Sequence, residues 1–177
     1  MSIELIPAKI EDIETILNMQ ITSFAELLEK YQDYDTSPAN ENYDNILFRF
    51  NQPETTYYFI YADNNKVGVI RVVDNKGKNR KRISPIFILP EYRNQGYAQQ
   101  AIIEAERIHG KSGWELDTIL QEKGNCHLYE KLGYKSTGTT KVINDKLTLV
   151  FYEKDWIMIK WHFDITSTMI NYSVAFS

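Results

Sequence analysis

The chain has 177 residues, of which 43% are hydrophobic and 25% charged, and its formal net charge is −4. A chain of this length and composition can bury one sizeable core, so we expect a single domain without internal repeats. The negative charge disfavours nucleic acid and anionic membranes as main partners, because both select clustered lysine and arginine. The run KGKNRKR at 76–82 is a local exception, which we interpret as a solvated loop.

The compartment is predicted from features of the whole sequence. The one cysteine, Cys126, cannot form an internal disulfide. The start MSIELIPAKI lacks the basic-then-apolar pattern of a signal peptide, and no apolar run approaches the length of a bilayer span. We therefore expect a cytoplasmic protein without a membrane partner.

The first third of the sequence predicts one strand and two helices. IELIPA at 3–8 has the composition of a short strand. A helix is predicted from Glu11 to about Tyr31, because apolar residues recur on one helical face: Ile13, Ile16, Leu17, Phe24, Leu27 and Leu28. The turn-rich, acidic stretch at 32–42 is a predicted loop before a shorter helix at 43–50.

The rest of the chain predicts mainly strands. The first hairpin turns at 63–65 and is followed by a third antiparallel strand at 82–89, and a second hairpin turns at Asn144 and Asp145. Between the hairpins we expect a helix ending near Gly110, a strand at 114–120 and a short helix closed by Gly133. The predicted class is α/β (α+β), with a mixed, mostly antiparallel sheet flanked by helices. The domain is expected to span 1–154, followed by an extension at 155–177.

A glycine-containing turn, RNQGYAQQAI at 93–102, links the third strand to the next helix. Such a turn directs several backbone N–H groups into one space, in front of the positive end of the helix dipole, and this geometry binds an anion such as a pyrophosphate. The alternative is that Gly96 only eases a tight connection, and the spacing alone does not separate the two readings.

The turn resembles the Arg/Gln-x-x-Gly-x-Gly/Ala signature of the GNAT superfamily of N-acetyltransferases, since Arg93, Gly96 and Ala98 match it. LYEKLGY at 128–134 resembles the helix and turn that the family has after its fifth strand. The predicted order of elements over residues 3–154 is also that of the family. This resemblance implies an enzyme that moves an acetyl group from acetyl-CoA to a primary amine.

The resemblance also implies where acetyl-CoA binds. The cosubstrate would lie between the strands at 82–89 and 114–120. Its pantetheine would pair with the backbone of Ile86, Phe87 and Ile88, as an added strand would. Its pyrophosphate would bind the backbone N–H groups of the turn: Arg93, Asn94, Gln95, Gly96, Tyr97 and Ala98.

Tyr129 is the residue that the resemblance places at the departing CoA thiolate, as a hydrogen-bond donor. The alternative is that Tyr129 packs the helix onto the sheet. The family often has an asparagine seven residues before this tyrosine, where this chain has Glu122. Asn125, four residues before the tyrosine, is then either a separate pantetheine contact or part of a rearranged loop.

The base that deprotonates the amine has two candidates. Keeping a lysine-like amine neutral at pH 7 costs about 4.6 kcal/mol, but Arg82 is the only charged side chain of the strand RISPIFIL. Glu115 and Asp117 alternate onto one face of the next strand, so either carboxylate could accept the proton. The alternatives are that both acids pair with an arginine such as Arg71, or that water accepts the proton.

The expected acceptor is a small cationic amine or a peptide amine. The region at 26–44 alternates acids with tyrosines, which suits a cation, although a solvated acidic loop has the same composition. We expect no metal, because the histidines lack metal-ligand spacing. A homodimer stays open, and the alternative function is a CoA-binding sensor or interaction module of the same fold with little catalysis.

Overall fold

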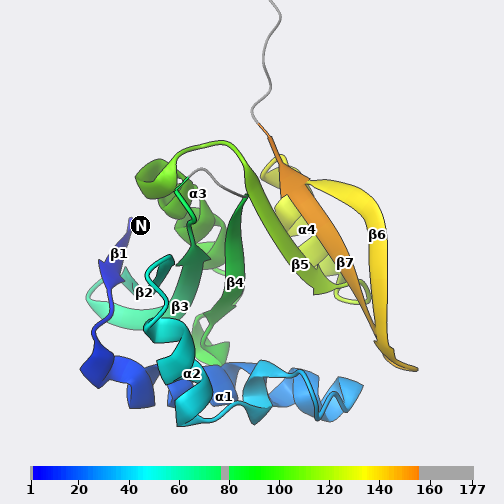
Figure 1. Ribbon diagram of the computed structural model, residues 1–177, viewed down its shortest axis with the longest axis horizontal. Helices are drawn as coiled ribbons and strands as arrows, with labels where there is room; N and C mark the ends of the chain where they lie inside the picture. Colours follow the sequence, from blue (N-terminus) through cyan, green and yellow to red (C-terminus); the bar gives the residue numbers. More distant parts are fainter. Residues whose placement is uncertain (1, 77–79, 156–177) are drawn as a thin grey trace, which may run out of the picture.

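The computed structural model describes residues 2–76 and 80–155. One seven-stranded sheet has the order β1-β2-β3-β4-β5-β7-β6 (Figure 1). Its strands are β1 (Ile3–Pro7), β2 (Thr55–Ala62), β3 (Asn65–Val73), β4 (Lys81–Ile88), β5 (Trp114–Ile119), β6 (Lys135–Asn144) and β7 (Leu147–Lys154). Only β4 and β5 pair in parallel, and every other neighbouring pair is antiparallel. The predicted fold class is confirmed.

Four α-helices cover the two faces of the sheet. They are α1 (Ile13–Tyr31), α2 (Tyr43–Phe50), α3 (Tyr97–His109) and α4 (Lys123–Lys131), and 3₁₀ turns lie at Ile10–Asp12, Pro38–Asn40 and Pro90–Tyr92. Helices α1 and α2 pack on Tyr57, Phe59, Val69 and Phe87. Helices α3 and α4 pack on the opposite face, in a larger core around Ile70, Trp114 and Leu116.

Local sequence signals account for these element boundaries. Asp63 and Asn64 adopt positive φ angles of 47° and 65°, which is the two-residue turn that closes the first hairpin. Helix α2 begins with a reciprocal cap, in which the side chains of Asn42 and Asn45 each accept the other's backbone N–H. Helix α3 ends at Gly110, whose φ is +97°.

One prediction needs correction. Lys81 and Arg82 begin β4, and Arg80 pairs with Glu153 and Asp155, so the basic run is not simply a solvated loop. The predicted extension at 156–177 lies outside the described residues.

No helix in the described part of the chain is long and apolar enough to cross a membrane. The cytoplasmic location stays a prediction.

Candidate acetyl-transfer site

The sheet opens between β4 and β5. The two strands pair only at Lys81 with Trp114 and at Arg82 with Glu115, and then separate (Figure 1). Leu89 donates its backbone N–H to Val67 of β3, and Phe87 lies opposite Val69 in the same register. Because hydrogen-bonded pairs alternate along an antiparallel ladder, the polar backbone groups of Ile86 and Ile88 point toward β5. Those of Phe87 are turned to β3.

The turn before α3 has the backbone conformation of an anion-binding site. Asn94 and Gly96 have positive φ angles of 62° and 79°, and Gly96 is the N-cap of α3 without a side-chain cap. Added atoms at Gly96 would meet only the Gln100 amide nitrogen, at 3.9 Å. The N–H groups of the first turn of a helix lack intrahelical partners, so this turn is suited to a phosphate group. The predicted role of residues 93–98 fits this geometry and stays a prediction.

The side chain of Arg93 is directed to α1. Its Nη2 donates to the backbone oxygen of Ser23 at 2.6 Å, and its Nη1 lies 3.1 Å from the Glu26 carboxylate. Its Nε also donates to the Ile88 oxygen at 3.4 Å. Arg93 therefore fixes the turn against α1, and its backbone N–H donates to the Pro90 oxygen at 3.3 Å. Its predicted contact with the pyrophosphate stays a prediction.

Tyr129 lies on α4 and is 7% exposed. Its ring packs edge-on against Tyr134 and at a tilt against Tyr152. Burial raises the pKa of Tyr129 above the usual value of a tyrosine, and the charge of Asp117 raises it further. The hydroxyl is therefore a neutral hydrogen-bond donor, and it donates to no residue in the described part of the chain. Tyr129 therefore packs the helix onto the sheet, and its predicted hydrogen bond to the departing thiolate stays a prediction.

The two candidate bases are joined to an arginine. Arg82 on β4 forms an ion pair with Asp117 across the opening, and its Nη1 lies 3.6 Å from Glu115. The arginine pairing that the sequence left open is therefore present, but the partner is Arg82 and not Arg71. Arg82 therefore occupies the Asp117 carboxylate that would have to accept a proton from an amine. The catalytic role of Glu115 and Asp117 stays a prediction.

A pocket of about 240 Å³ lies beside this ion pair. The residues that line it come from β4, β5, β6 and β7: Arg82, Glu115, Leu116, Thr137, Thr139, Phe151, Tyr152 and Glu153. Phe151 and Glu153 lie opposite Asp117 and Glu115 in the ladder, so all four share the sheet face that α1 and α2 cover farther along. An acceptor can approach the opening from this side.

Asn125 is an exposed residue in the first turn of α4, and its backbone N–H bonds to Glu122. Its predicted contact with pantetheine stays a prediction. Glu122, at the position where the family often has asparagine, is directed to α1. Its Oε1 accepts hydrogen bonds from the Tyr31 hydroxyl at 2.5 Å and from Lys30 Nζ at 2.6 Å.

Three of the six acids in the region at 26–44 are engaged within the protein. Glu26 pairs with Arg93, Glu41 pairs with Arg49, and Asp33 accepts from the backbone and hydroxyl of Thr36. Tyr34 is 62% exposed. This region is therefore a weaker candidate for binding a cationic acceptor than the pocket beside Glu115.

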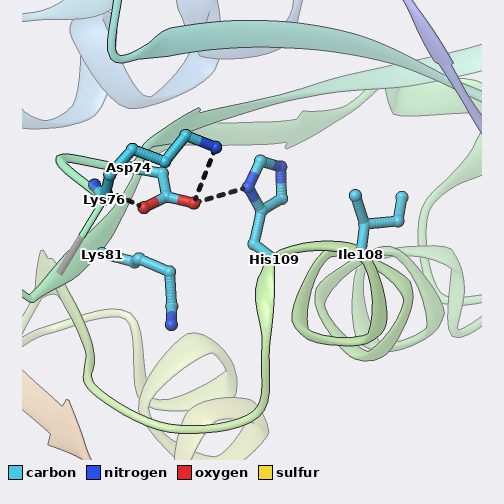
Figure 2. A pocket seen from close by; sticks show the side chains of 5 residues that line it. All are labelled: Asp74, Lys76, Lys81, Ile108 and His109. Carbon is cyan, nitrogen blue, oxygen red and sulfur yellow. Dashed lines mark hydrogen bonds and ion pairs between the residues drawn. The ribbon is translucent and has the colours of Figure 1, made fainter.

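A second hollow, of about 530 Å³, lies at the closed end of the sheet (Figure 2). There His109 Nδ1 lies 3.0 Å from the Asp74 carboxylate, and its Nε2 lies 2.9 Å from the Tyr58 hydroxyl. Burial raises the pKa of Asp74, but the hydrogen bonds from His109 and from the Lys76 backbone, together with the charges of these two residues, bring it below its usual value. A helix of 13 residues is about 20 Å long, so this cluster at the end of α3 is remote from the turn at its start.

Sequence reasoning missed two sets of contacts. The pairing of Arg82 with Asp117 and Glu115 could in principle have been predicted from the sequence. A basic residue on one strand attracts acids on the next strand when they lie on the same face of the sheet. The contact between Tyr31 and Glu122 joins residues that are 91 positions apart. Sequence spacing carries no signal for such a contact.

Solved acetyltransferase structures share this fold. The paia N-acetyltransferase of Thermoplasma acidophilum, solved in complex with coenzyme A, is 22% identical, with a TM-score of 0.61 over 87% of this chain and 99% of that chain. The spermidine N-acetyltransferase of Vibrio cholerae, solved with CoA and spermine, is 17% identical, with a TM-score of 0.66 over 85% and 94%. A Salmonella typhimurium acetyltransferase that modifies the N-terminal serine of ribosomal protein L7/L12 is 14% identical, with a TM-score of 0.65 over 86% and 94%.

Among curated protein sequences, none matches the chain. The sequence pattern of the acetyltransferase (GNAT) family matches residues 16–134, which include β4, the turn before α3, β5 and the helix of Tyr129. The match covers more than half of the chain and both motifs that resemble the family. The chain therefore belongs to the acetyltransferase (GNAT) family and is an acetyl-CoA-dependent N-acyltransferase.

Proposed function

We propose that the protein acetylates a primary amine by direct attack of the amine on acetyl-CoA within a ternary complex. The observation that carries the proposal is the opening between β4 and β5, where the backbone groups of Ile86 and Ile88 face β5 beside the turn at Asn94 and Gly96. Acetyl-CoA supplies a thioester carbonyl and, as CoA, a thiolate leaving group. The acceptor is a small cationic amine or a peptide amine.

The protein binds the cosubstrate mainly through its backbone. Ile86 and Ile88 hold the pantetheine as a neighbouring strand would, and the N–H groups of residues 93–98 hold the pyrophosphate. Asn125 is a further candidate contact at the start of α4. This arrangement fixes the thioester at the opening, where α1 covers one side and α4 the other.

The acceptor enters from the pocket beside Glu115 and Glu153, whose carboxylates favour an ammonium group. The neutral amine nitrogen forms a bond to the carbonyl carbon, the carbon–sulfur bond breaks, and the electron pair leaves on sulfur. Tyr129 donates a hydrogen bond to that sulfur. Arg82 already binds the Asp117 carboxylate and lies near Glu115, so we place water between the amine and these carboxylates.

An amine panel tests this function. Purified protein is incubated with acetyl-CoA and with spermidine, amino acids or short peptides, and both free thiol and acetylated product are measured. The proposal predicts one mole of acetylated amine for each mole of thiol. Binding of acetyl-CoA without any acetylated product would contradict the proposal and would favour a sensor or interaction module.

A further inference from the structure

Arg71 differs from every other arginine of the chain. The remaining five arginines each have a carboxylate partner: Arg49 with Glu41, Arg80 with Glu153 and Asp155, Arg82 with Asp117 and Glu115, Arg93 with Glu26, and Arg107 with Glu104. Arg71 has no such partner among residues 2–76 and 80–155. It is also buried, with 9% of its surface exposed.

The surroundings of the Arg71 guanidinium are polar, and no carboxylate of the described residues forms an ion pair with it. Its Nε donates to the backbone oxygen of Ser84 on β4, and its carbon lies 5.9 Å from the centroid of the Tyr57 ring. The Tyr57 hydroxyl and, more weakly, the charge of Glu41 also act on the guanidinium. Burial lowers the pKa of Arg71, and the nearby charge of Arg49 lowers it further.

The nearest carboxylate is already shared. Glu41 accepts two hydrogen bonds from Arg49 and a third, at 2.8 Å, from the Gln20 amide. One negative charge therefore faces two guanidinium groups, which leaves a net charge of +1 in a buried cluster. The Tyr57 hydroxyl and the Gln20 amide oxygen in the same cluster are buried and lack hydrogen-bond partners in the described part of the chain.

An unpaired buried charge is costly, and proteins keep one mainly where a ligand completes the pair. Arg71 lies opposite Tyr57, on the sheet face that carries Arg82 and the acceptor pocket. Its contact residue Ser84 is two positions before Ile86, whose backbone faces the opening. An anion bound to Arg71 would thus lie beside the proposed transfer site, on the acceptor side.

We propose that Arg71 binds a carboxylate of the acceptor, so that the substrate is an amine that also carries a carboxylate, such as an amino acid. This inference rests on the proposed function and narrows its acceptor class. A guanidinium presents parallel N–H donors that match the two oxygens of a carboxylate. The ammonium end of the same molecule would face Glu115 and Glu153.

Matched acceptors test the inference on the unaltered protein. Each amino acid is compared with its amide and with the amine left after removal of its carboxylate, for example lysine with lysinamide and cadaverine. We expect kcat/KM to be roughly 100-fold higher for the best amino acid than for its two counterparts without a carboxylate, because loss of the carboxylate leaves Arg71 without a counter-ion. Equal rates for the three members of each set would overturn the inference.

The variant Arg71→Gln assigns the preference to this residue. Glutamine can still donate to the Ser84 oxygen but has no charge, and we expect the ratio of kcat/KM between acid and amide to fall to about 1. Arg107→Gln, which removes an exposed arginine on α3, should keep the full ratio. If Arg71→Gln keeps the acid-to-amide ratio of kcat/KM of the unaltered protein, another residue recognises the carboxylate. If Arg71→Gln does not fold, the comparison of matched acceptors on the unaltered protein still tests whether the acceptor carries a carboxylate.

A binding measurement separates this inference from the proposed function. CoA-loaded protein is titrated with N-acetyl amino acids and their amides, which requires no turnover. If only the N-acetyl amino acids bind, and if Arg71→Gln no longer binds them, the result supports the carboxylate site even if no amine is acetylated. Acetylation of amines without any effect of the carboxylate keeps the proposed function and overturns the carboxylate site.

Discussion

Tyr129 has the properties of a hydrogen-bond donor rather than of a proton donor. Its hydroxyl is neutral, because burial and the charge of Asp117 raise its pKa above the usual value. A thiol has an ordinary pKa of about 8.5, so full transfer of the phenolic proton to the thiolate would be strongly uphill. A hydrogen bond that strengthens as charge develops on sulfur stabilises the transition state without that cost.

The variant Tyr129→Phe tests this role. We expect kcat to fall about 100-fold, while the KM for acetyl-CoA changes little, since the lost bond forms mainly in the transition state. Steady-state kinetics with the best acceptor measures both parameters. Tyr134→Phe is the control, because its hydroxyl donates to Glu106 and its ring touches Tyr129. It should reduce stability and leave kcat nearly unchanged, and equal losses of kcat in both variants would contradict the assignment.

Single residues were predictable where the backbone alone determines the role. The positive φ of Gly96 follows from a strand-to-helix turn with one glycine, and the sequence identified that turn. Roles that depend on a distant partner were not predictable. Arg82 was noticed only as the one charged residue of its strand, and its pairing with Asp117 depends on how β4 meets β5.

Helix α1 connects the two sides of the open sheet. Arg93 ties its middle to the turn after β4, and Tyr31 and Lys30 tie its end to Glu122 after β5. Asn144, in the second hairpin, also donates to the Tyr31 oxygen at 3.0 Å. Figure 1 shows α1 running across the wide end of the opening between β4 and β5. These contacts join the turn after β4 to the loop after β5 through α1.

Glu122→Gln tests the contribution of α1 to stability. The hydrogen bonds from Lys30 and Tyr31 lower the pKa of Glu122 below the usual value of a glutamate. A lowered folded-state pKa gives stability that is present above the unfolded-state value and disappears as the pH falls through the folded-state value. We expect the variant to be about 1 kcal/mol less stable at pH 7, and the difference to shrink below pH 4.5.

Urea unfolding at a series of pH values measures this difference. Glu29→Gln is the matched control, because it removes the same charge from an exposed position of α1 that has no ion pair in the described part of the chain. A stability difference that stays constant down to pH 3, or an equal effect in the control, would contradict the role of Glu122.

At the scale of elements, local patterns were sufficient for most predictions. The helical period at 13–28 predicted α1, and the Asp-Asn pair predicted the first hairpin turn. The sequence did not reveal that Gln20 and Ser23 are buried beside those apolar residues. Their burial depends on the polar cluster of Glu41 and Arg49, which belongs to the next elements.

The whole molecule consists of two groups of strands that meet at one narrow contact. Strands β1 to β4 form one group and β5 to β7 the other, and only two residue pairs join β4 to β5. The sequence predicted the order of elements but not the position of β7 between β5 and β6. Either strand of a hairpin can pair with the neighbouring strand of a sheet. Only packing on α4 and β5 determines which strand of this hairpin lies next to β5.

The most direct test of acetyl-CoA binding in this opening is thermal unfolding with CoA, acetyl-CoA, ATP and NAD. The variants are Gly96→Glu, which adds a side chain and a negative charge at the turn, and Gly138→Glu. Gly138 has nearly the same φ as Gly96, 80° against 79°, and lies on the exposed strand β6, so it controls for backbone strain and charge. We expect CoA and acetyl-CoA at 100 times their Kd to raise the Tm by roughly 5 to 10 °C. That rise should be kept in Gly138→Glu and lost in Gly96→Glu, whereas an undiminished rise in Gly96→Glu, or an equal rise with ATP or NAD, would contradict the assigned site.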